Sequence, residues 1–397
     1  MSRPFRSLAV AMVAASGIAL MTAGAAPAIA APATAVARSA TPVVTVVASG
    51  LNDPKEVTLG PGGLYVAESG TGGSSCVTIA GTSYCEGQTG AIVLVNGAGT
   101  RTVLSGLPSV VNSAEGTLGP ACVTFIGGKL GVLFQDTAVN SDGTTSVVGP
   151  ESNLFGKLAL AAPFSSAAQW TAGPDVAGFA AANPQNAATL GGVPGGETTY
   201  DSDPYDIIPY RGGWAIADAA ANDVLWLSPG GSLSVIDRLP TVPETVPAGV
   251  FGPSPVTIDA QAVPTSLAVG PDGALYAGTL PGFPANAGTA SIYRLVPGQT
   301  PAVVATGLTE VSSIAFDQGR LLALEFNTAG GLGAATVPGP LAEVGPGGTV
   351  STLPVSGLNE PTGLAVGPGG AVYVATSGNG AAGTGEVVKI TGLDLGW

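Results

Sequence analysis

The chain has 397 residues, of which 45% are hydrophobic and 10% are charged, and its formal net charge is −14. The hydrophobic fraction is too high for a disordered chain, and the negative charge disfavours nucleic acid and anionic membranes as partners. With 61 Gly and 33 Pro, the composition is typical of many short strands joined by tight turns.

Residues 1–30 have the layout of a secretory signal. Arg3 and Arg6 precede an uncharged apolar run that ends in the small-residue sequence Ala28-Ile29-Ala30, which fits a cleavage site. An uncleaved membrane anchor is the alternative, but the run is rich in Ala and Gly and weakly hydrophobic for a permanent span. We therefore expect an extracellular protein that is free of the membrane after cleavage. Cleavage would change the net charge from −14 to −16 and leave residues 31–42 as a flexible leader.

From residue 43 onward the chain repeats one unit. Each unit has a turn, an alternating apolar strand, a Gly-rich hairpin turn and a second strand, and most units add a third and a fourth strand. The likeness is clearest between SGLNDPKEVTLGPGGLYVAESG at 49–70 and SGLNEPTGLAVGPGGAVYVATSG at 356–378. The turns are anchored at Pro54, Pro120, Pro204, Pro264, Val311 and Pro361. Six units of four antiparallel strands predict an all-β protein, either a six-bladed β-propeller or a solenoid.

The two ends of the repeated region favour the propeller. The last unit has three strands, whereas the first unit is preceded by an orphan fourth-strand pattern, TPVVTVVASGL. We expect Val43–Ala48 to pair with Glu386–Ile390 and so to close a ring, because closure removes the exposed sheet edges that an open solenoid must cap. We therefore expect a single propeller domain over residues 43–397, and we expect the protein to be a monomer.

The three cysteines divide into a pair and a single thiol. Cys76 and Cys85 flank a short Ser/Thr/Gly-rich insert, and in a secreted protein they are expected to form a disulfide. Cys122 lies in an apolar strand pattern and is expected to be a buried free thiol.

The longest departure from the repeat is residues 161–200. Asp175 is expected to cap a short helix there, which ends at Asn183-Pro184. The segment is a candidate lid, with a simple surface insert as the alternative. A second irregularity, Asn222-Asp223, is expected to form a turn, with metal ligation as the alternative.

Acidic side chains recur at two positions of the repeat that antiparallel pairing places on the same face of the disc. These are the start of the first strand with its leading turn, and the end of the second strand. The candidate ligand- or metal-binding residues are Glu56, Glu68, Asp203, Asp206, Asp218 and Glu325, and Asp53, Glu310 and Glu360 also lie in the leading turns. We expect an acidic opening over the central channel, with Lys55 as an exception. The oxygens either bind Ca²⁺ or another hard cation, or accept backbone N–H groups and cap turns.

The chain contains no His, which excludes a Ser-His-Asp triad, an HExxH zinc site and a His general base. Two functions remain. The first is a secreted binding or interaction module for an unknown small molecule or protein, with calcium as the candidate stabilising ion. The alternative is a metal-dependent hydrolase or lactonase, in which a metal polarises a carbonyl and a carboxylate acts as base. Glu56, Asp206, Asp218 and Glu325 would then be the reacting groups.

Three stretches resemble the ScyD/ScyE family of secreted bacterial proteins. They are SGLNDPKEVTLGPGGLYVAESGTGG, DSDPYDIIPYRGGWAIADAAANDVLWL and VPTSLAVGPDGALYAGTLPGFP, and the likeness covers nearly the whole chain after the signal. The resemblance implies a six-bladed propeller related to NHL and gluconolactonase-like folds, and no established reaction. Where such proteins often have a Gly-Pro-His-Asp turn, this chain has Gly119-Pro120-Ala121-Cys122. A role that rests on that His, or a streptogramin-lyase-like elimination that needs one, is therefore not expected.

Overall fold

The computed structural model describes residues 41–79, 82–112, 116–135, 154–162, 170–183, 202–331 and 337–393. The predicted signal and nearly all of the predicted leader lie outside these ranges, as does much of the 161–200 segment. No helix within the described ranges combines the length and apolar character needed to span a bilayer.

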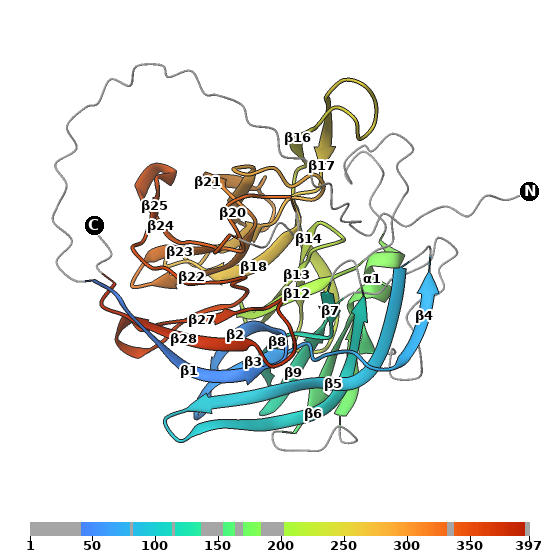
Figure 1. Ribbon diagram of the computed structural model, residues 1–397, viewed down its shortest axis with the longest axis vertical. Coiled ribbons are helices and arrows are strands. Elements are labelled where there is room, and N and C mark those ends of the chain that lie inside the picture. The colour runs from blue at the N-terminus through green and yellow to red at the C-terminus, as the bar shows by residue number, and fades with distance from the viewer. Residues whose placement is uncertain are drawn as a thin grey trace, which may run out of the picture.

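Six sheets surround a common axis (Figure 1), and we call them blades 1 to 6 in chain order. Blade 1 contains β2 (Pro54–Gly60), β3 (Gly63–Glu68), β5 (Thr82–Asn96), β6 (Gly99–Asn112) and β7 (Gly116–Leu118), and β4 (Ser75–Ile79) pairs with β5. Blade 2 contains β8 (Pro120–Ile126), β9 (Lys129–Phe134), β10 (Lys157–Ala161) and β11 (Trp170–Asp175). Blade 3 contains β12 (Pro204–Tyr210), β13 (Gly213–Asp218), β14 (Asp223–Leu227) and β15 (Leu233–Arg238).

The second half repeats this plan. Blade 4 contains β18 (Pro264–Val269), β19 (Leu275–Thr279), β20 (Ala290–Leu295) and β21 (Ala302–Leu308). Blade 5 contains β22 (Val311–Asp317), β23 (Arg320–Glu325), β24 (Leu341–Val344) and β25 (Val350–Thr352). Blade 6 contains β26 (Leu364–Val366), β27 (Val372–Thr376), β28 (Gly385–Thr391) and β1 (Val43–Leu51). A separate hairpin, β16 (Val242–Val246) and β17 (Val256–Ala260), projects between blades 3 and 4 (Figure 1).

The innermost strands form a closed circle. β2, β8, β12, β18, β22 and β26 each contact the next, and β26 in turn contacts β2. A solenoid would leave its first and last units apart. The six-bladed propeller is therefore confirmed, and the solenoid is wrong.

Strands from opposite ends of the described chain complete blade 6. β1 pairs antiparallel with β28, with Val44 opposite Ile390 and Ala48 opposite Val387. The predicted pairing is confirmed, and β1 continues three residues beyond the predicted segment, to Leu51. The similar sequences at 49–70 and 356–378 thus belong to neighbouring blades.

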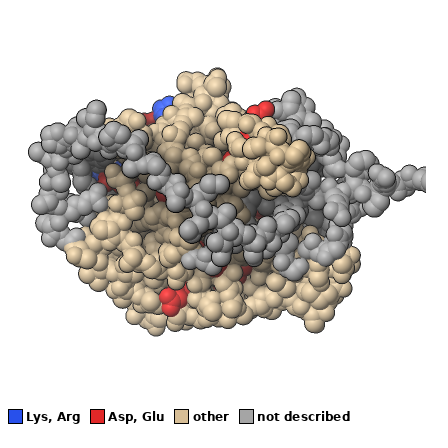
Figure 2. Space-filling model, turned by 45° about the horizontal axis from the view of Figure 1, so that its top comes forward, with Lys and Arg blue, Asp and Glu red and all other residues tan. Residues whose placement is uncertain are grey.

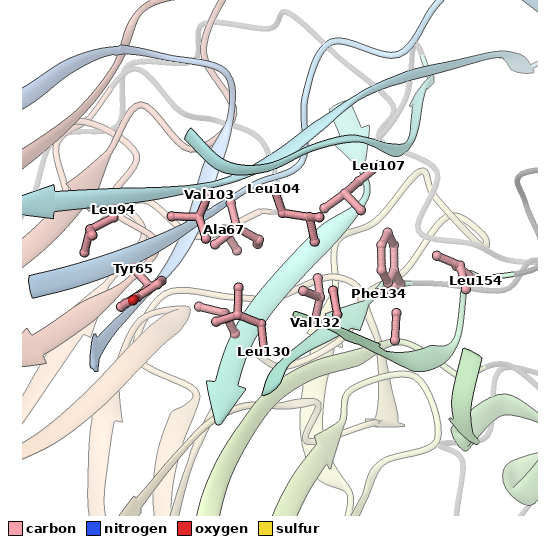
Figure 3. Close-up of a cluster of buried hydrophobic side chains, with 14 residues drawn as sticks. Tyr65, Ala67, Leu94, Val103, Leu104, Leu107, Leu130, Val132, Phe134 and Leu154 are labelled. Atoms are coloured by element: carbon pink, nitrogen blue, oxygen red, sulfur yellow. The ribbon is translucent and has the colours of Figure 1, made fainter. Parts of the chain in front are cut away.

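The hydrophobic core consists of six clusters, one at each interface between neighbouring blades. Figure 3 shows the interface between blades 1 and 2, where Val132 and Phe134 of blade 2 face Leu104 and Leu107 of blade 1. Strand residues alternate between the two faces of a blade, so each blade packs on both sides. Stability therefore depends on every blade having both of its neighbours.

Two local predictions are confirmed, and several strands were not predicted, β11 and the β16–β17 hairpin among them. Cys76 and Cys85 lie opposite each other on β4 and β5 and form a disulfide. Helix α1 (Val176–Ala182) begins after Asp175, whose Oδ1 accepts the N–H of Gly178 at 2.7 Å. Strand β11 was missed because its sequence, WTAGPD, contains Gly and Pro and lacks apolar alternation. The hairpin β16–β17 was also missed, because it stands outside the repeat.

Ring closure can be tested with two substitutions in β1. Leu51 is 3% exposed and packs between blades 6 and 1, whereas Val43 is 58% exposed on the same strand. We expect Leu51→Ala to lower the free energy of unfolding by about 2–4 kcal/mol and Val43→Ala by less than about 0.5 kcal/mol, measured by urea denaturation. Equal effects would mean that β1 does not close the ring through this interface.

Candidate functional site

One position of the repeat recurs near the start of the first strand in every blade. It lies two residues after each turn anchor and is occupied by Glu56, Cys122, Asp206, Ser266, Ser313 and Gly363. In blades 1 to 5 the pairing between the first and second strands shifts register at this point. Such β-bulges re-aim side chains. We call these six residues the axial ring.

Glu56 connects three blades. Its Oε1 accepts the N–H groups of Val57 at 3.0 Å and Leu364 at 3.1 Å, and its Oε2 accepts the Ser313 hydroxyl at 3.3 Å. Blade 1 is thereby joined to blades 6 and 5. Gly363 makes this approach possible, because a Cβ there would lie 2.5 Å from the carbonyl oxygen of Lys55.

Asp206 connects the other three blades. Its Oδ2 accepts the N–H of Leu267 in blade 4 at 2.7 Å, and its Oδ1 accepts the thiol of Cys122 in blade 2 at 3.4 Å. Cys122 is buried and free, as predicted. Together, Glu56 and Asp206 reach all six blades.

The two acids are close enough to affect each other's ionisation. Burial raises the pKa of Glu56 well above its usual value, and the charge of Asp206 raises it further. Burial also raises the pKa of Asp206, although the bonds from Leu267 and Cys122 oppose the shift. Because like charges cannot both ionise cheaply when buried together, the proximity of the two acids favours keeping a proton on the pair.

Glu68, Asp218 and Glu325 end their second strands and hold the turns that lead into their blades. They accept the N–H groups of Asn52 at 2.7 Å, Asp203 at 2.8 Å and Thr309 at 2.6 Å, respectively. Burial raises the pKa of all three, to about 7 for Asp218 and Glu325. They therefore make the turn-capping contacts that sequence analysis left open as an alternative to metal binding.

A second group of side chains lies where the first strands begin. We call this group the mouth, and it consists of Asp53, Lys55, Asp203, Tyr205 and Glu360. Lys55 Nζ pairs with Asp53 Oδ1 at 2.8 Å and donates to the carbonyl oxygen of Gly378 at 2.8 Å. The charges of Asp53 and Lys55 also act on Glu360, whose pKa burial raises. The predicted exception among the acids, Lys55, is thus held by an acid and a carbonyl.

Tyr205 is the mouth residue that sequence analysis missed. It is half-buried, and burial raises the pKa of its phenol. The charges of Asp203, Asp53, Glu56 and Asp206 raise it further. The signal in the sequence was an aromatic residue directly after an anchoring Pro, where the other units have Lys, Ala, Thr or Ser.

The structure thus brings together three of the six predicted residues, Glu56, Asp203 and Asp206, around Tyr205. Glu68 and Glu325 belong to the turns of blades 1 and 5, and Asp218 accepts the backbone N–H of Asp203. On the face in Figure 2 the visible acidic side chains are scattered among uncharged ones.

Calcium prefers six to eight oxygen ligands. Within the described ranges no group of three or more Asp, Glu and Cys is placed to hold a metal ion. The oxygens of Glu56 and Asp206 are also directed at backbone N–H, hydroxyl and thiol donors. The described residues at the axis therefore do not provide the set of ligands that calcium requires.

The chain matches no family model and no curated protein. It is similar in structure to a glucose dehydrogenase, with 15% sequence identity, a TM-score of 0.50 and coverage of 87% of this chain and 99% of that one. The PQQ-bound form of an aldose sugar dehydrogenase from Streptomyces coelicolor matches at 14% identity and a TM-score of 0.46, covering 89% and 99%. A virginiamycin B lyase from Staphylococcus aureus matches at 11% sequence identity and a TM-score of 0.45, and the match covers 88% of this chain and 99% of that one. At these identities the likeness shows the propeller fold alone.

The raised pKa of Glu325 predicts how stability depends on pH. Its folded-state pKa of about 7 exceeds the ordinary value of 4.5, so its contribution is complete below about pH 4.5 and is lost as the pH rises through 7. Between pH 5 and 8 we expect the free energy of unfolding to fall, and Glu325→Gln to reduce this fall by about 2 kcal/mol. Urea denaturation at several pH values measures it. The exposed Asp259 on β17 supplies the control, since Asp259→Asn should keep the wild-type slope. A slope unchanged by Glu325→Gln would contradict this assignment.

Proposed function

We propose that this protein is a secreted β-propeller binding module that takes a small positively charged ligand at the mouth. The observation that carries the proposal is the half-buried Tyr205, whose phenol lies in the combined field of Asp53, Glu56, Asp203 and Asp206. An aromatic ring with carboxylates around it suits an ammonium group, through cation–π attraction and charge.

The charges at the mouth support this choice of ligand. Lys55 pairs with Asp53, donates to the carbonyl oxygen of Gly378 and acts by its charge on Glu360, and the carboxyl groups of Asp53, Asp203 and Glu360 outnumber this one ammonium group. The net charge of −14 also draws cations toward the molecule. Both effects weaken with salt, since the Debye length at physiological ionic strength is about 8 Å.

Membership of the ScyD/ScyE family and export from the cell are part of the proposal. The three resembling stretches and the signal-like residues 1–30 support them. A metal-dependent hydrolase has less support, because the described residues do not assemble a third metal ligand beside Glu56 and Asp206.

Isothermal titration with spermidine at pH 7 tests the proposal, because this small polyamine presents ammonium groups without a metal. We expect salt-sensitive binding, weakened about 5- to 10-fold by Asp203→Asn, largely kept in Tyr205→Phe, which preserves the ring, and weakened in Tyr205→Leu, which removes the ring.

Asp259→Asn is the matched control, because it removes the same charge from the exposed face of β17. It should bind spermidine as the wild type does. Absence of binding at low salt, or an equal loss in Asp203→Asn and Asp259→Asn, would refute a cation site at the mouth.

A further inference from the structure

Blade 3 buries a second pair of acids, away from the axial ring. Asp218 ends β13 and Asp223 begins β14, and the two are Cα partners across the sheet. Asp218 is fully buried and Asp223 is 4% exposed. Residues directly opposite on antiparallel strands share a face, so the carboxyl groups are neighbours.

The two acids differ in their partners. Asp218 accepts the Ser202 hydroxyl at 2.6 Å and the N–H groups of Asp203 at 2.8 Å and Ala221 at 3.3 Å. The Oδ1 of Asp223 is buried and has no hydrogen-bond partner. A buried oxygen without a donor is costly when ionised. The protonated form of Asp223 is therefore favoured.

Asn222 places Asp223 in this position. Its backbone has a φ of 55°, its Oδ1 accepts the N–H of Val263 at 2.9 Å, and its Nδ2 donates to the carbonyl oxygen of Leu239 at 2.9 Å. The predicted turn is thus present up to Asn222, whereas Asp223 already belongs to β14, and the turn is fixed to Val263, directly before blade 4.

Arg238 links this acid pair to helix α1. Arg238 is the Cα partner of Asp223 on β15, and its Nη2 donates to the carbonyl oxygen of Asn183, the residue that ends α1, at 3.2 Å. At the other end of α1, Val176 belongs to the same buried cluster as Ile216 of blade 3. The guanidinium group is therefore within reach of two acceptors, one on the helix and one on the sheet.

Other charged groups near Asp223 also affect its ionisation or lie on neighbouring elements. Asp218 raises the pKa of Asp223 and Arg238 lowers it, while burial, the largest cause, raises it well above its usual value. Asp203 acts on Asp218. Asp237 partners Val224 and so lies on the opposite face of the blade. At the start of α1, Asp175 pairs with Lys157 at 3.5 Å.

We propose that Asp223 and Arg238 form a proton-controlled latch for helix α1. While the acid pair holds its proton, Asp223 is neutral and Arg238 stays on the carbonyl oxygen of Asn183. When the proton leaves to solvent, ionised Asp223 gains Arg238 as a charge-assisted partner, and the end of α1 is released. Burial raises the pKa of Asp218 to about 7 and that of Asp223 well above its usual value, so the proton leaves at a higher pH than it would from an exposed Asp.

Hydrogen–deuterium exchange of the full chain at pH 6 and pH 9, corrected for base catalysis, tests the latch. We expect the protection of the Val176–Ala182 amides to fall about tenfold at pH 9 relative to the amides of Gly213–Asp218, which report on blade 3 itself. Asp223→Asn, which stays neutral, should keep α1 protected at both pH values. Arg238→Gln should leave α1 weakly protected at both.

Asp259→Asn is again the control and should behave as the wild type. Equal wild-type protection at pH 6 and pH 9 would overturn the latch, and so would a fall in Asp223→Asn as large as in the wild type. If the Gly213–Asp218 amides lose protection together with α1, the blade opens as a whole and the latch is also overturned.

Discussion

The constraint on which the structure depends is the burial of two carboxyl groups at the axis of a ring. Glu56 bonds to blades 5 and 6, and Asp206 to blades 2 and 4, so that two side chains on blades 1 and 3 hold the whole circle. Burying two like charges is unfavourable unless a proton is kept. The protonation of Glu56 and Asp206 is therefore linked to the free energy of unfolding, because the same two residues connect the blades.

The rest of the architecture follows from closing the circle. Each blade buries both faces against its neighbours in six separate clusters, and β1 supplies the missing outer strand of blade 6. Loops at the ends of the strands are then free to differ. The disulfide-bonded β4–β5 hairpin, helix α1 and the β16–β17 hairpin are such additions, and Glu244 of the last one accepts the hydroxyl of Thr289 at 2.5 Å.

Repetition explains what could be predicted from sequence. Blade order, ring closure and the shared repeat position of Glu56 and Asp206 follow from spacing, because the same spacing recurs in units of known geometry. The cap at Asp175 follows instead from local sequence, an Asp before a short helical run that ends at Asn183-Pro184. The distance of a side chain from the central axis does not follow from spacing. Glu68 and Glu325 share a face of the disc with Glu56, but they bind their own turns, at Asn52 and Thr309. Strand β11 was missed because its sequence contains Gly and Pro and lacks apolar alternation. The β16–β17 hairpin was missed because it stands outside the repeat, and Tyr205 because it is aromatic where other units are not.

A double-mutant cycle on Glu56→Gln and Asp206→Asn, followed by urea denaturation at pH 7, tests the central claim most directly. If the two acids share one proton and one network, the second substitution should act differently once the first is present. We expect a coupling free energy of about 1 kcal/mol or more. Effects that add to within about 0.3 kcal/mol would show that the two residues hold their blades independently, and would contradict the account of a shared axial pair.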